Sequence, residues 1–408
     1  METTGAQDLV GSIPDHVAPE LVHLFDIYED AGLRRDLHRQ YARLHDEAPA
    51  IFWTPANGGH WMVTRYDAIS AVCMDTDHFS NAESQIPPVA NAPKFIPLNY
   101  DPPENMPYRK ILMPYFSPKA VKAMDEQIAI QANRIVDAVR AKGQCEFVHE
   151  VAAPFPVTVF MLLMGIPLDR FDDLRALVED FFNLQGQPRV EQVAAAISAE
   201  MAALIDARRA EPREDLVSFL VQADMGGRLL TQDELVNMCF LLLLAGLDTV
   251  TNMLTFTIHR LAEEPALQER LIADPSLIEA FVEEGLRLFG VVNVPRVVKQ
   301  DHELFGATLR TGDMVLCTLP LAGRDDTKHE HPARFDIDRT DKKHLTFSTG
   351  AHLCLGHFLA RSELKKMFAV WMTKVGRFRL AEQPDFHYRA GTVMALDSLK
   401  LEWNVAAD

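Results

Sequence analysis

A long apolar segment between Thr231 and Pro265 is the feature that most constrains how this chain folds. It begins at Thr231-Gln-Asp-Glu234, a capping box in which the Thr231 hydroxyl and the Glu234 carboxylate each bind a free backbone amide. Pro265 ends the helix, because proline has no amide hydrogen and clashes with the preceding turn. About 30 residues of helix span roughly 45 Å, enough to cross a domain. Because residues 239–247 are apolar on every side, the sequence predicts a central helix that is buried all round.

The size and composition of the chain are those of a large folded protein. Its 408 residues exceed the roughly 250–300 at which one simple core stops growing, and we expect one large composite domain over residues 1–408. The net charge of −18 argues against a nucleic-acid partner. The longest uninterrupted apolar run, residues 238–247, is about half of what a membrane-spanning helix needs. The N-terminus lacks the pattern of a secretory signal, so we expect a cytoplasmic protein without a membrane anchor.

The remaining pattern predicts a mainly α, α+β fold with small sheets. A second capping box, Ser276-Leu-Ile-Glu279, predicts a helix that ends near Phe289. Two β-like runs, residues 51–53 and 61–63, are joined by the turn signal Asn57-Gly58-Gly59. Further short β-like runs cover residues 296–298, 308–309 and 314–319, and most of the first 230 residues are amphipathic helix. The strand–helix alternation of a doubly wound fold is not present in this pattern.

One cysteine stands in a context that favours chemistry. The segment Phe347-Ser-Thr-Gly350-Ala-His352-Leu-Cys354-Leu-Gly356 leads directly into a helical run. A cysteine just before a helix N-terminus lies where backbone amides and the helix dipole stabilise a thiolate. Gly350 and Gly356 would let the backbone fold around the sulfur and let a flat ligand approach, which suits a haem iron ligand. On spacing alone, a buried inert cysteine is an equally good interpretation. The five cysteines contain no CxxC pair, which argues against disulfides and structural zinc: Cys73, Cys145, Cys239, Cys317 and Cys354.

Two further segments carry unusual residues. Glu284 and Arg287 lie three residues apart in the second capped helix, with Arg334 downstream, although such a pair is usually solvated and of small value. In the long apolar helix, Gly246 and Asp248 are both costly choices. Thr249 could donate back to the Ala245 carbonyl, loosen the helix and open a small groove. A threonine satisfied by its own helix is the alternative.

Taken together and in this order, the three motifs resemble the cytochrome P450 superfamily of haem-thiolate monooxygenases, over essentially the whole chain. The nearest resemblance is to the bacterial camphor hydroxylase group, through Asp101-Pro-Pro-Glu104, residues 155–167, residues 246–250 and His352-Leu-Cys-Leu-Gly356. It implies a triangular, helix-rich prism with a long central helix over haem b. It also implies that Cys354 is the iron ligand, that Asp248 and Thr249 are the acid–alcohol pair that delivers protons, and that Glu284, Arg287 and Arg334 form a buried triad.

The resemblance also assigns residues to the cofactor. Haem propionates need cationic or donor partners, because carboxylates in a partly dry pocket are otherwise costly. By position in the family pattern those partners are Arg109, Arg296 and His352, and Phe347, Gly350 and Gly356 belong to the cofactor-binding loop. Two positions depart from the pattern: Asn105 stands where many relatives have a histidine, and Val294 where the camphor enzyme has an acid.

The substrate positions depart more informatively. Where the camphor enzyme has a tyrosine hydroxyl that binds the substrate ketone, this chain has Pro93, which has no donor. We therefore expect an apolar terpenoid or norisoprenoid, such as an ionone-type ketone, in preference to camphor. Asn293 and Thr392 are the possible polar contacts. The predicted substrate-binding residues are Pro93, Phe95, Leu241, Leu244, Ala245, Val292, Asn293, Thr392 and Val393.

The chain contains none of the common nucleotide-binding motifs, so electrons must come from another protein. The resemblance implies a [2Fe-2S] ferredoxin with its NAD(P)H-dependent reductase, and O₂ as the second substrate. We expect an acidic ferredoxin to dock through charge complementarity around Arg109, Lys110, Lys343, Arg361 and Lys365, and we expect a monomer. A peroxide-driven peroxygenase and a haem sensor without catalytic activity are the alternatives, and neither needs the Asp248–Thr249 pair.

Overall fold

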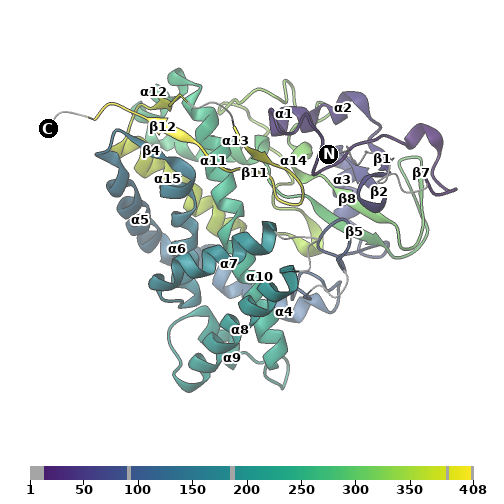
Figure 1. Ribbon diagram of the computed structural model, residues 1–408, viewed down its shortest axis with the longest axis horizontal. Helices are drawn as coiled ribbons and strands as arrows, with labels where there is room; N and C mark the ends of the chain where they lie inside the picture. Colours follow the sequence, from purple (N-terminus) through teal and green to yellow (C-terminus); the bar gives the residue numbers. More distant parts are fainter. Residues whose placement is uncertain (1–12, 90–92, 184–188, 383–385, 406–408) are drawn as a thin grey trace, which may run out of the picture.

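The computed structural model describes residues 13–89, 93–183, 189–382 and 386–405. The N-terminal residues 1–12, on which the expectation about a secretory signal partly rests, lie outside this range. The molecule is a broad triangle in which helices fill the left and lower parts and the main sheet lies at the right (Figure 1). This is the helix-rich prism that the sequence predicts.

The main sheet joins segments from both halves of the chain in the order β1-β2-β8-β5-β3. The predicted hairpin is confirmed, because β1 and β2 pair antiparallel with Trp53 opposite Trp61. β2 then pairs in parallel with β8, and β8 pairs antiparallel with β5. The strands are β1 (Ile51–Thr54), β2 (His60–Val63), β3 (Phe79–Ser80), β5 (Val294–Val298) and β8 (Met314–Cys317).

Three smaller sheets lie outside this one. β12 pairs with both β4 and β9, β6 pairs with β7 as a hairpin, and β10 pairs with β11. Their strands are β4 (Gln144–Glu146), β6 (His302–Leu304), β7 (Ala307–Leu309), β9 (Arg379–Leu380), β10 (Tyr388–Arg389), β11 (Ala395–Leu396) and β12 (Lys400–Glu402).

Helices make up the body of the protein. They are α1 (Leu37–Ala42), α2 (Leu44–Glu47), α3 (Tyr66–Met74), α4 (Asn105–Phe116), α5 (Pro118–Arg140), α6 (Pro154–Met164), α7 (Phe171–Asn183), α8 (Arg189–Ala210), α9 (Leu216–Gln222), α10 (Gln232–Leu247), α11 (Thr249–Ala262), α12 (Pro265–Ala273), α13 (Ile278–Leu288), α14 (Leu319–Ala322) and α15 (His357–Lys374). The short turns η3 (Val148–Ala152), η5 (Pro275–Leu277) and η6 (Gly350–His352) connect them. α15 packs along α5, and both carry buried residues on the shared face.

The long central helix is present, but it is interrupted. The capping box at Thr231 and Glu234 is confirmed, and the chain leaves the helix after Ala262, before Pro265. Between α10 and α11, Asp248 has φ −111° and ψ −36°, which breaks the regular helix. The Thr249 hydroxyl donates to the Ala245 carbonyl at 3.3 Å, as the sequence predicts. The helix is therefore broken at a single residue, next to the threonine that was expected to loosen it, where side chain and backbone compete for the same carbonyl.

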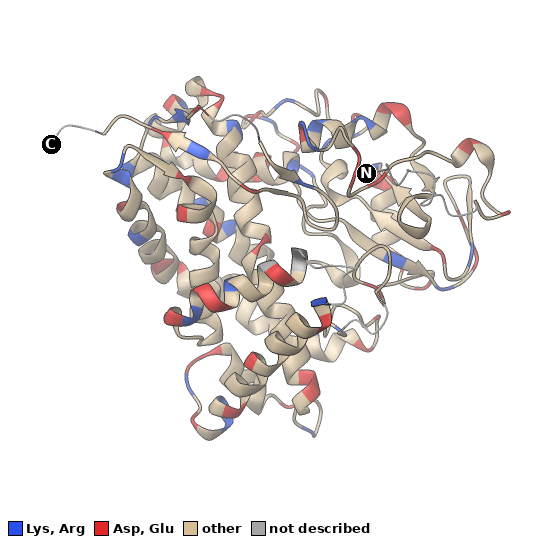
Figure 2. Ribbon diagram, in the orientation of Figure 1, with Lys and Arg blue, Asp and Glu red and all other residues tan. Residues whose placement is uncertain are grey.

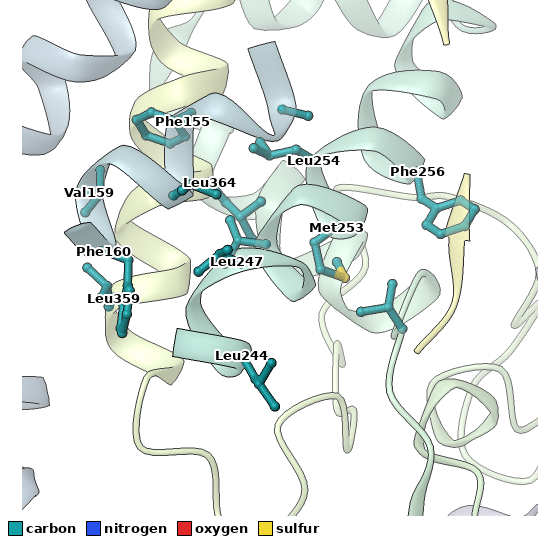
Figure 3. Close-up of a cluster of buried hydrophobic side chains, with 14 of the residues drawn as sticks. Phe155, Val159, Phe160, Leu244, Leu247, Met253, Leu254, Phe256, Leu359 and Leu364 are labelled. Atoms are coloured by element: carbon teal, nitrogen blue, oxygen red, sulfur yellow. The ribbon is translucent and has the colours of Figure 1, made fainter. Parts of the chain in front are cut away.

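The central helices pack against α6 and α15. A Cβ at Gly246 would lie 2.5 Å from the Phe160 ring, so glycine is needed for the close approach of α10 and α6. Figure 3 shows the side chains of this contact: Leu244 and Leu247 on α10, Phe155, Val159 and Phe160 on α6, and Leu359 and Leu364 on α15. The packing explains why the segment tolerates a residue that costs about 1 kcal/mol in a helix interior.

The central segment is long and apolar enough to cross a membrane by length and composition, but 72% of its apolar 18-residue window is buried inside the protein. Between Leu235 and His259 its only Lys, Arg, Asp or Glu is Asp248. Figure 2 shows that the charged residues lie mainly on the outer helices and loops. The segment is thus the core of the fold.

One helix start differs from the prediction. The capping box at Ser276 and Glu279 is wrong, because Asp274 accepts the Ser276 amide and hydroxyl at 3.0 and 2.6 Å. The turn η5 follows Asp274, and α13 begins only at Ile278. The aspartate is the stronger acceptor, and it leaves the serine hydroxyl as a donor.

Candidate active site

The loop before α15 presents Cys354. The Phe347 carbonyl accepts the Cys354 amide at 2.9 Å, and the turn η6 lies between these residues. Gly350 has φ +70°, and a Cβ there would lie 2.9 Å from the Cys73 carbonyl oxygen of α3. The glycine therefore lets the loop approach α3, a close contact within the protein in addition to the tight fold and the ligand approach that the sequence predicts for it. Gly356 is the N-cap of α15, and its missing Cβ would lie 4.0 Å from the Cys354 Sγ.

Cys354 differs from the other cysteines. All five cysteines are free and lie in the described part of the chain, where four are buried and Cys354 is exposed. Its thiol faces open space although protein atoms surround it on other sides, and this burial raises its pKa above the ordinary value. The amide of Gly356 and the positive charges of Arg109 and Arg361 act in the opposite direction and favour the thiolate.

The predicted propionate partners lie together beside this cysteine. Arg109 donates to the Leu353 carbonyl at 2.6 Å. Burial, with the nearby charges of Arg296 and Arg109, lowers the pKa of His352 to about 4, so the imidazole is neutral near pH 7. Arg296 is only 2% exposed, and its described partners are the Pro295 carbonyl and, at 3.9 Å, the Cys73 sulfur.

This donor set fits a haem. Two guanidinium groups and a neutral imidazole surround one place, and the buried His352 Nε2 has no hydrogen-bond partner among the described residues. Buried cations and donors without acceptors are costly unless an anion completes them. The two propionates of a haem whose iron binds Cys354 would do so. Arg109, Arg296 and His352 would therefore hold the propionates, and Cys354 the iron.

Asn105 is a buried donor that the predicted set left out. It is 0% exposed, and neither polar atom of its amide has a hydrogen-bond partner in the described ranges. It lies four residues before Arg109, on the same face of α4. That spacing is the signal in the sequence that could have added it to the cofactor-binding residues.

Behind the loop, a buried ion pair ties α13 to the irregular segment that follows α14. Glu284 and Arg287 are both 0% exposed and form two hydrogen bonds, at 2.7 and 2.8 Å. Glu284 also accepts the Asp336 amide at 2.9 Å. Arg287 donates to the carbonyls of Gly323, Pro332 and Arg334. The pair is therefore completely surrounded by hydrogen-bond partners, which is the condition under which a buried ion pair is tolerated.

The predicted third member of this triad, Arg334, is wrong. Its side chain is 69% exposed and lies 3.9 Å from Asp336, and its contribution to the network is its backbone carbonyl. Arg339 takes the place instead, because its Nε lies 3.5 Å from the Glu284 carboxylate and its side chain is 11% exposed. Both arginines occur in one loop, and only its path in three dimensions decides which one turns inward.

On the other side, the break between α10 and α11 has two different faces. Ala245 is exposed although its neighbours Leu242, Leu243 and Leu244 are buried, and Thr249 is half-buried one turn later. Asp248 instead borders a cavity of about 260 Å³. The cavity is also lined by His149, Arg175, Thr251, Asn252, Arg389 and Asp397. The side chains of Arg389 and Asp397 are 37% and 50% exposed, so polar groups lead from Asp248 to the surface.

The predicted substrate residues divide into two groups. Val292 and Val393 are paired in an antiparallel bridge, and with Pro93, Leu241 and Thr392 they are half-buried. Phe95 and Leu244 are 8% and 7% exposed and belong to the core. Asn293 as a polar contact is wrong: it is 1% exposed, accepts the Tyr41 hydroxyl at 3.1 Å and donates to the Gly391 carbonyl at 2.7 Å. Its amide holds the backbone together and does not face a ligand.

Tyr28 joins Thr392 as a polar group that sequence reasoning missed. Its hydroxyl donates to the Ile86 carbonyl at 2.6 Å and lies 3.4 Å from the Thr392 Oγ1. Gly391 has φ +111°, and a Cβ there would lie 2.4 Å from the Tyr28 ring. No pattern near residue 28 indicates this contact, because 364 residues separate the two hydroxyl groups in the sequence.

The predicted docking cations are not equivalent. Arg361 pairs with Glu283 at 2.7 Å and stacks over the Phe347 ring at 4.6 Å, so it supports the cysteine loop. Lys365 pairs with Glu279. Lys110 is exposed, and Lys343 is 71% exposed although it lies 3.3 Å from Asp341. Exposed apolar side chains on the same elements are Met106, Met113, Leu353 and Phe358.

Known proteins share these features over nearly the whole chain. The family model described as Cytochrome P450 matches residues 180–387. A probable cytochrome P450 127A1 from Sinorhizobium fredii is 34% identical over 405 residues, which cover 96% of this chain and 97% of the relative. The crystal structure of CYP101J2 superposes with a TM-score of 0.90 at 35% identity, covering 97% of this chain and 100% of that one. The crystal structure of CYP101C1 also gives a TM-score of 0.90, at 32% identity and 96% and 100% coverage.

Proposed function

The chain belongs to the cytochrome P450 family of monooxygenases that bind haem b, and from this premise we propose that it hydroxylates an apolar terpenoid or norisoprenoid with electrons from a [2Fe-2S] ferredoxin. One observation carries the proposal. The exposed Cys354 lies at a helix N-terminus, beside the half-buried Arg109 and the buried Arg296 and His352, three side chains that together would bind an anion. We propose residues 1–408 as one functional unit that works in the cytoplasm as a monomer.

The protein would position and electronically tune the cofactor. When bound, the haem supplies the oxidising chemistry that inserts one oxygen atom of O₂ into a C–H bond. Cys354 supplies the thiolate, which the Gly356 amide, Arg109 and Arg361 stabilise. Phe347 holds the Cys354 amide through its carbonyl and supports Arg361 with its ring, so this residue keeps the loop in shape.

We assign proton transfer to Asp248 and Thr249. Asp248 borders the polar cavity that leads to Arg389 and Asp397, which provides a source of protons. Thr249 is on the opposite side of the break, one turn after the exposed Ala245. A carboxylate that takes protons from the cavity could pass them to the adjacent Thr249 hydroxyl, which would deliver them at the haem.

The substrate assignment rests on the apolar residues that remain open. Leu241, Ala245, Val292 and Val393 offer hydrocarbon contacts, and with Asn293 excluded the polar contact falls to Thr392, supported by Tyr28. One hydroxyl suits a substrate with one ketone or alcohol group. Pro93 removes the ketone donor of the camphor enzyme, so camphor should bind worse than a larger ionone-type ketone.

A spectroscopic screen tests the substrate class. Binding that expels water from the haem iron changes the absorbance from the low-spin to the high-spin form, so ionones, other terpenoids and camphor can be ranked by titration. We expect ionone-type ketones to give a larger change at lower concentration than camphor, and Thr392→Val to weaken ketones more than the matching hydrocarbons. A larger response to camphor than to any ionone would contradict the substrate assignment, while leaving the monooxygenase function intact.

The ferredoxin partner is tested separately, at the exposed Lys110. Lys110→Glu should raise the KM for an acidic ferredoxin several-fold, and this loss should shrink as salt increases. Arg39→Glu is the matched control, because Arg39 is an exposed cation on α1 and the change in charge is the same. Equal effects of the two variants would rule out docking at this surface.

A further inference from the structure

Three metal-ligating side chains, none of them assigned to the haem site, meet at the edge of the main sheet. Asp75 follows the end of α3, His78 comes just before β3, and His302 begins β6. One ligand atom from each lies within 4.8 Å of the other two. The rings of His78 and His302 are 4.0 Å apart between centroids and tilted by 32°. Figure 1 places α3, β5 and β7 on the sheet side of the molecule, away from the large helices.

The local backbone brings these groups together without help from a ligand. Asp75 Oδ1 accepts the amides of Asp77 and His78, both at 3.1 Å, and so closes a tight turn. Asp75 Oδ2 lies 2.7 Å from His78 Nδ1. The His78 carbonyl accepts the Lys299 amide at 2.7 Å, which holds the β3 side against the strand that leads to His302. The arrangement is therefore fixed by main-chain hydrogen bonds on both sides.

The imidazoles have coordination capacity to spare. Among the described residues, neither ring nitrogen of His302 forms a hydrogen bond, and His78 forms one through Nδ1 but none through Nε2. The His302 ring instead packs against two other rings, that of Phe79 edge-on at 5.8 Å and that of His78 at 4.0 Å. Two tilted imidazoles gain little from each other, and they repel when both are charged, so the close approach of the pair needs another explanation.

We propose that Asp75, His78 and His302 form a binding site for a divalent transition-metal ion of the zinc class. Two imidazoles and one carboxylate are the ligand set that Zn²⁺ takes at about 2.0–2.2 Å, with water in the fourth position. Tetrahedral ligands at that length are roughly 3.3 Å apart. The three side chains lie within 4.8 Å and are half-buried, so small rotations about their side-chain bonds are enough to close the site.

The surrounding charges permit a cation there. Lys299 directs its ammonium group to the Thr76 carbonyl at 2.9 Å and toward Asp101 at 4.0 Å. Asp77, Asp301 and Glu303 flank the three residues in sequence, and Asp301 is paired with Arg310 at 2.6 Å. The metal would then connect the end of α3 to the β6–β7 hairpin. Asp75 and His302 are 227 positions apart in the sequence.

Zinc titration of the intact enzyme tests the site. Holoenzyme without an affinity tag, freed of loose metal with EDTA, is titrated with ZnCl₂ by calorimetry, and its thermal midpoint is followed by circular dichroism. We expect one equivalent to bind, and the midpoint to rise by about 3 °C when zinc is a hundredfold above its Kd. His302→Ala and His78→Ala should each abolish this equivalent, and Asp75→Asn should weaken it about 10–100-fold.

The matched control is His331→Ala, which removes an exposed histidine next to Glu330, 3.7 Å away. It should bind zinc and gain stability as the unmodified enzyme does. Each variant is first checked for an unchanged spectrum of the reduced carbon monoxide complex, which shows that the haem site has folded. The proposal is overturned if the unmodified enzyme binds no zinc, or if His302→Ala or Asp75→Asn binds it as tightly as the unmodified enzyme.

Discussion

The two sides of the haem site are built in opposite ways. On the cysteine side, the loop from Phe347 to Gly356 is closed by backbone hydrogen bonds, and behind it Glu284 and Arg287 are fully buried and fully partnered. On the other side, the central helix is broken at Asp248, and a polar cavity of about 260 Å³ borders the break. The two sides therefore show that holding a cofactor and moving protons need different structures.

The physical reasons differ accordingly. A metal ligand must keep one position, so its support is a network in which every buried polar group has a partner, and such networks make a structure rigid. A proton path must accept and release hydrogen bonds, so its groups cannot all be occupied by fixed partners. The threonine that competes for the Ala245 carbonyl loosens the helix at the place where this exchange is required.

The largest effect should come from the ligand itself. Cys354→Ser should lose the red-shifted Soret peak of the reduced carbon monoxide complex and essentially all hydroxylation, because a hydroxyl replaces the thiolate. Cys145→Ser is the control, since Cys145 is a buried cysteine on β4, in the sheet formed by β4, β12 and β9. Retention of the peak in Cys354→Ser would contradict the assignment of Cys354 as the iron ligand.

Next comes the network behind the cysteine loop. Glu284→Ala should lower the free energy of unfolding by about 3–5 kcal/mol, because it leaves the buried Arg287 guanidinium without its counter-ion. Arg334→Ala should change it by less than about 0.5 kcal/mol, since that side chain is exposed. Urea denaturation followed by circular dichroism measures both. If Arg334→Ala were as damaging as Arg339→Ala, the assignment of Arg339 to the triad would be wrong.

Changes at the break between α10 and α11 should alter how much of the consumed reductant yields product, and not the stability of the fold. Thr249→Ala should bind substrate and consume reductant normally, but form about tenfold less product and correspondingly more hydrogen peroxide, because protons no longer reach the right place. Thr249→Ser keeps the hydroxyl and should restore most of the product. Thr255→Ala is the control six residues along the same helix, where the hydroxyl donates to the Thr251 carbonyl. Unchanged coupling in Thr249→Ala would take this residue out of proton transfer.

The smallest effect concerns pH. Burial would raise the pKa of Glu283, but His344 and Arg361 outweigh it and lower this pKa to about 2. Because the pKa in the folded protein lies below the ordinary 4.5, the stability from Glu283 is present above about pH 4.5 and is lost as the pH falls toward 2. Glu283→Gln should therefore lower the thermal midpoint near pH 7, and the difference should shrink toward pH 3. A constant difference across this range would show that the contribution is not electrostatic.

Much of the fold and site could be predicted because it depends on local patterns. The capping box at Thr231, the break near Thr249, the turn at Asn57 and the cysteine loop all act through neighbours within a few residues. One failure is also local, because Asp274, only two residues before Ser276, is the stronger acceptor and caps the turn. The other two are of a different kind: Arg339 replaced Arg334, and Asn293 turned away from the substrate, because each was decided by which partner the folded chain brought near.

Periodicity, capping and glycine positions act over short range, so they are enough to predict a buried central helix and a cysteine at a helix N-terminus. The contacts between distant segments depend on how the chain packs: Tyr28 with Thr392, Arg339 with Glu284, and Asp75 and His78 with His302. Hydrogen bonds and ion pairs depend steeply on separations of a few ångströms, and those separations exist only once the chain has packed.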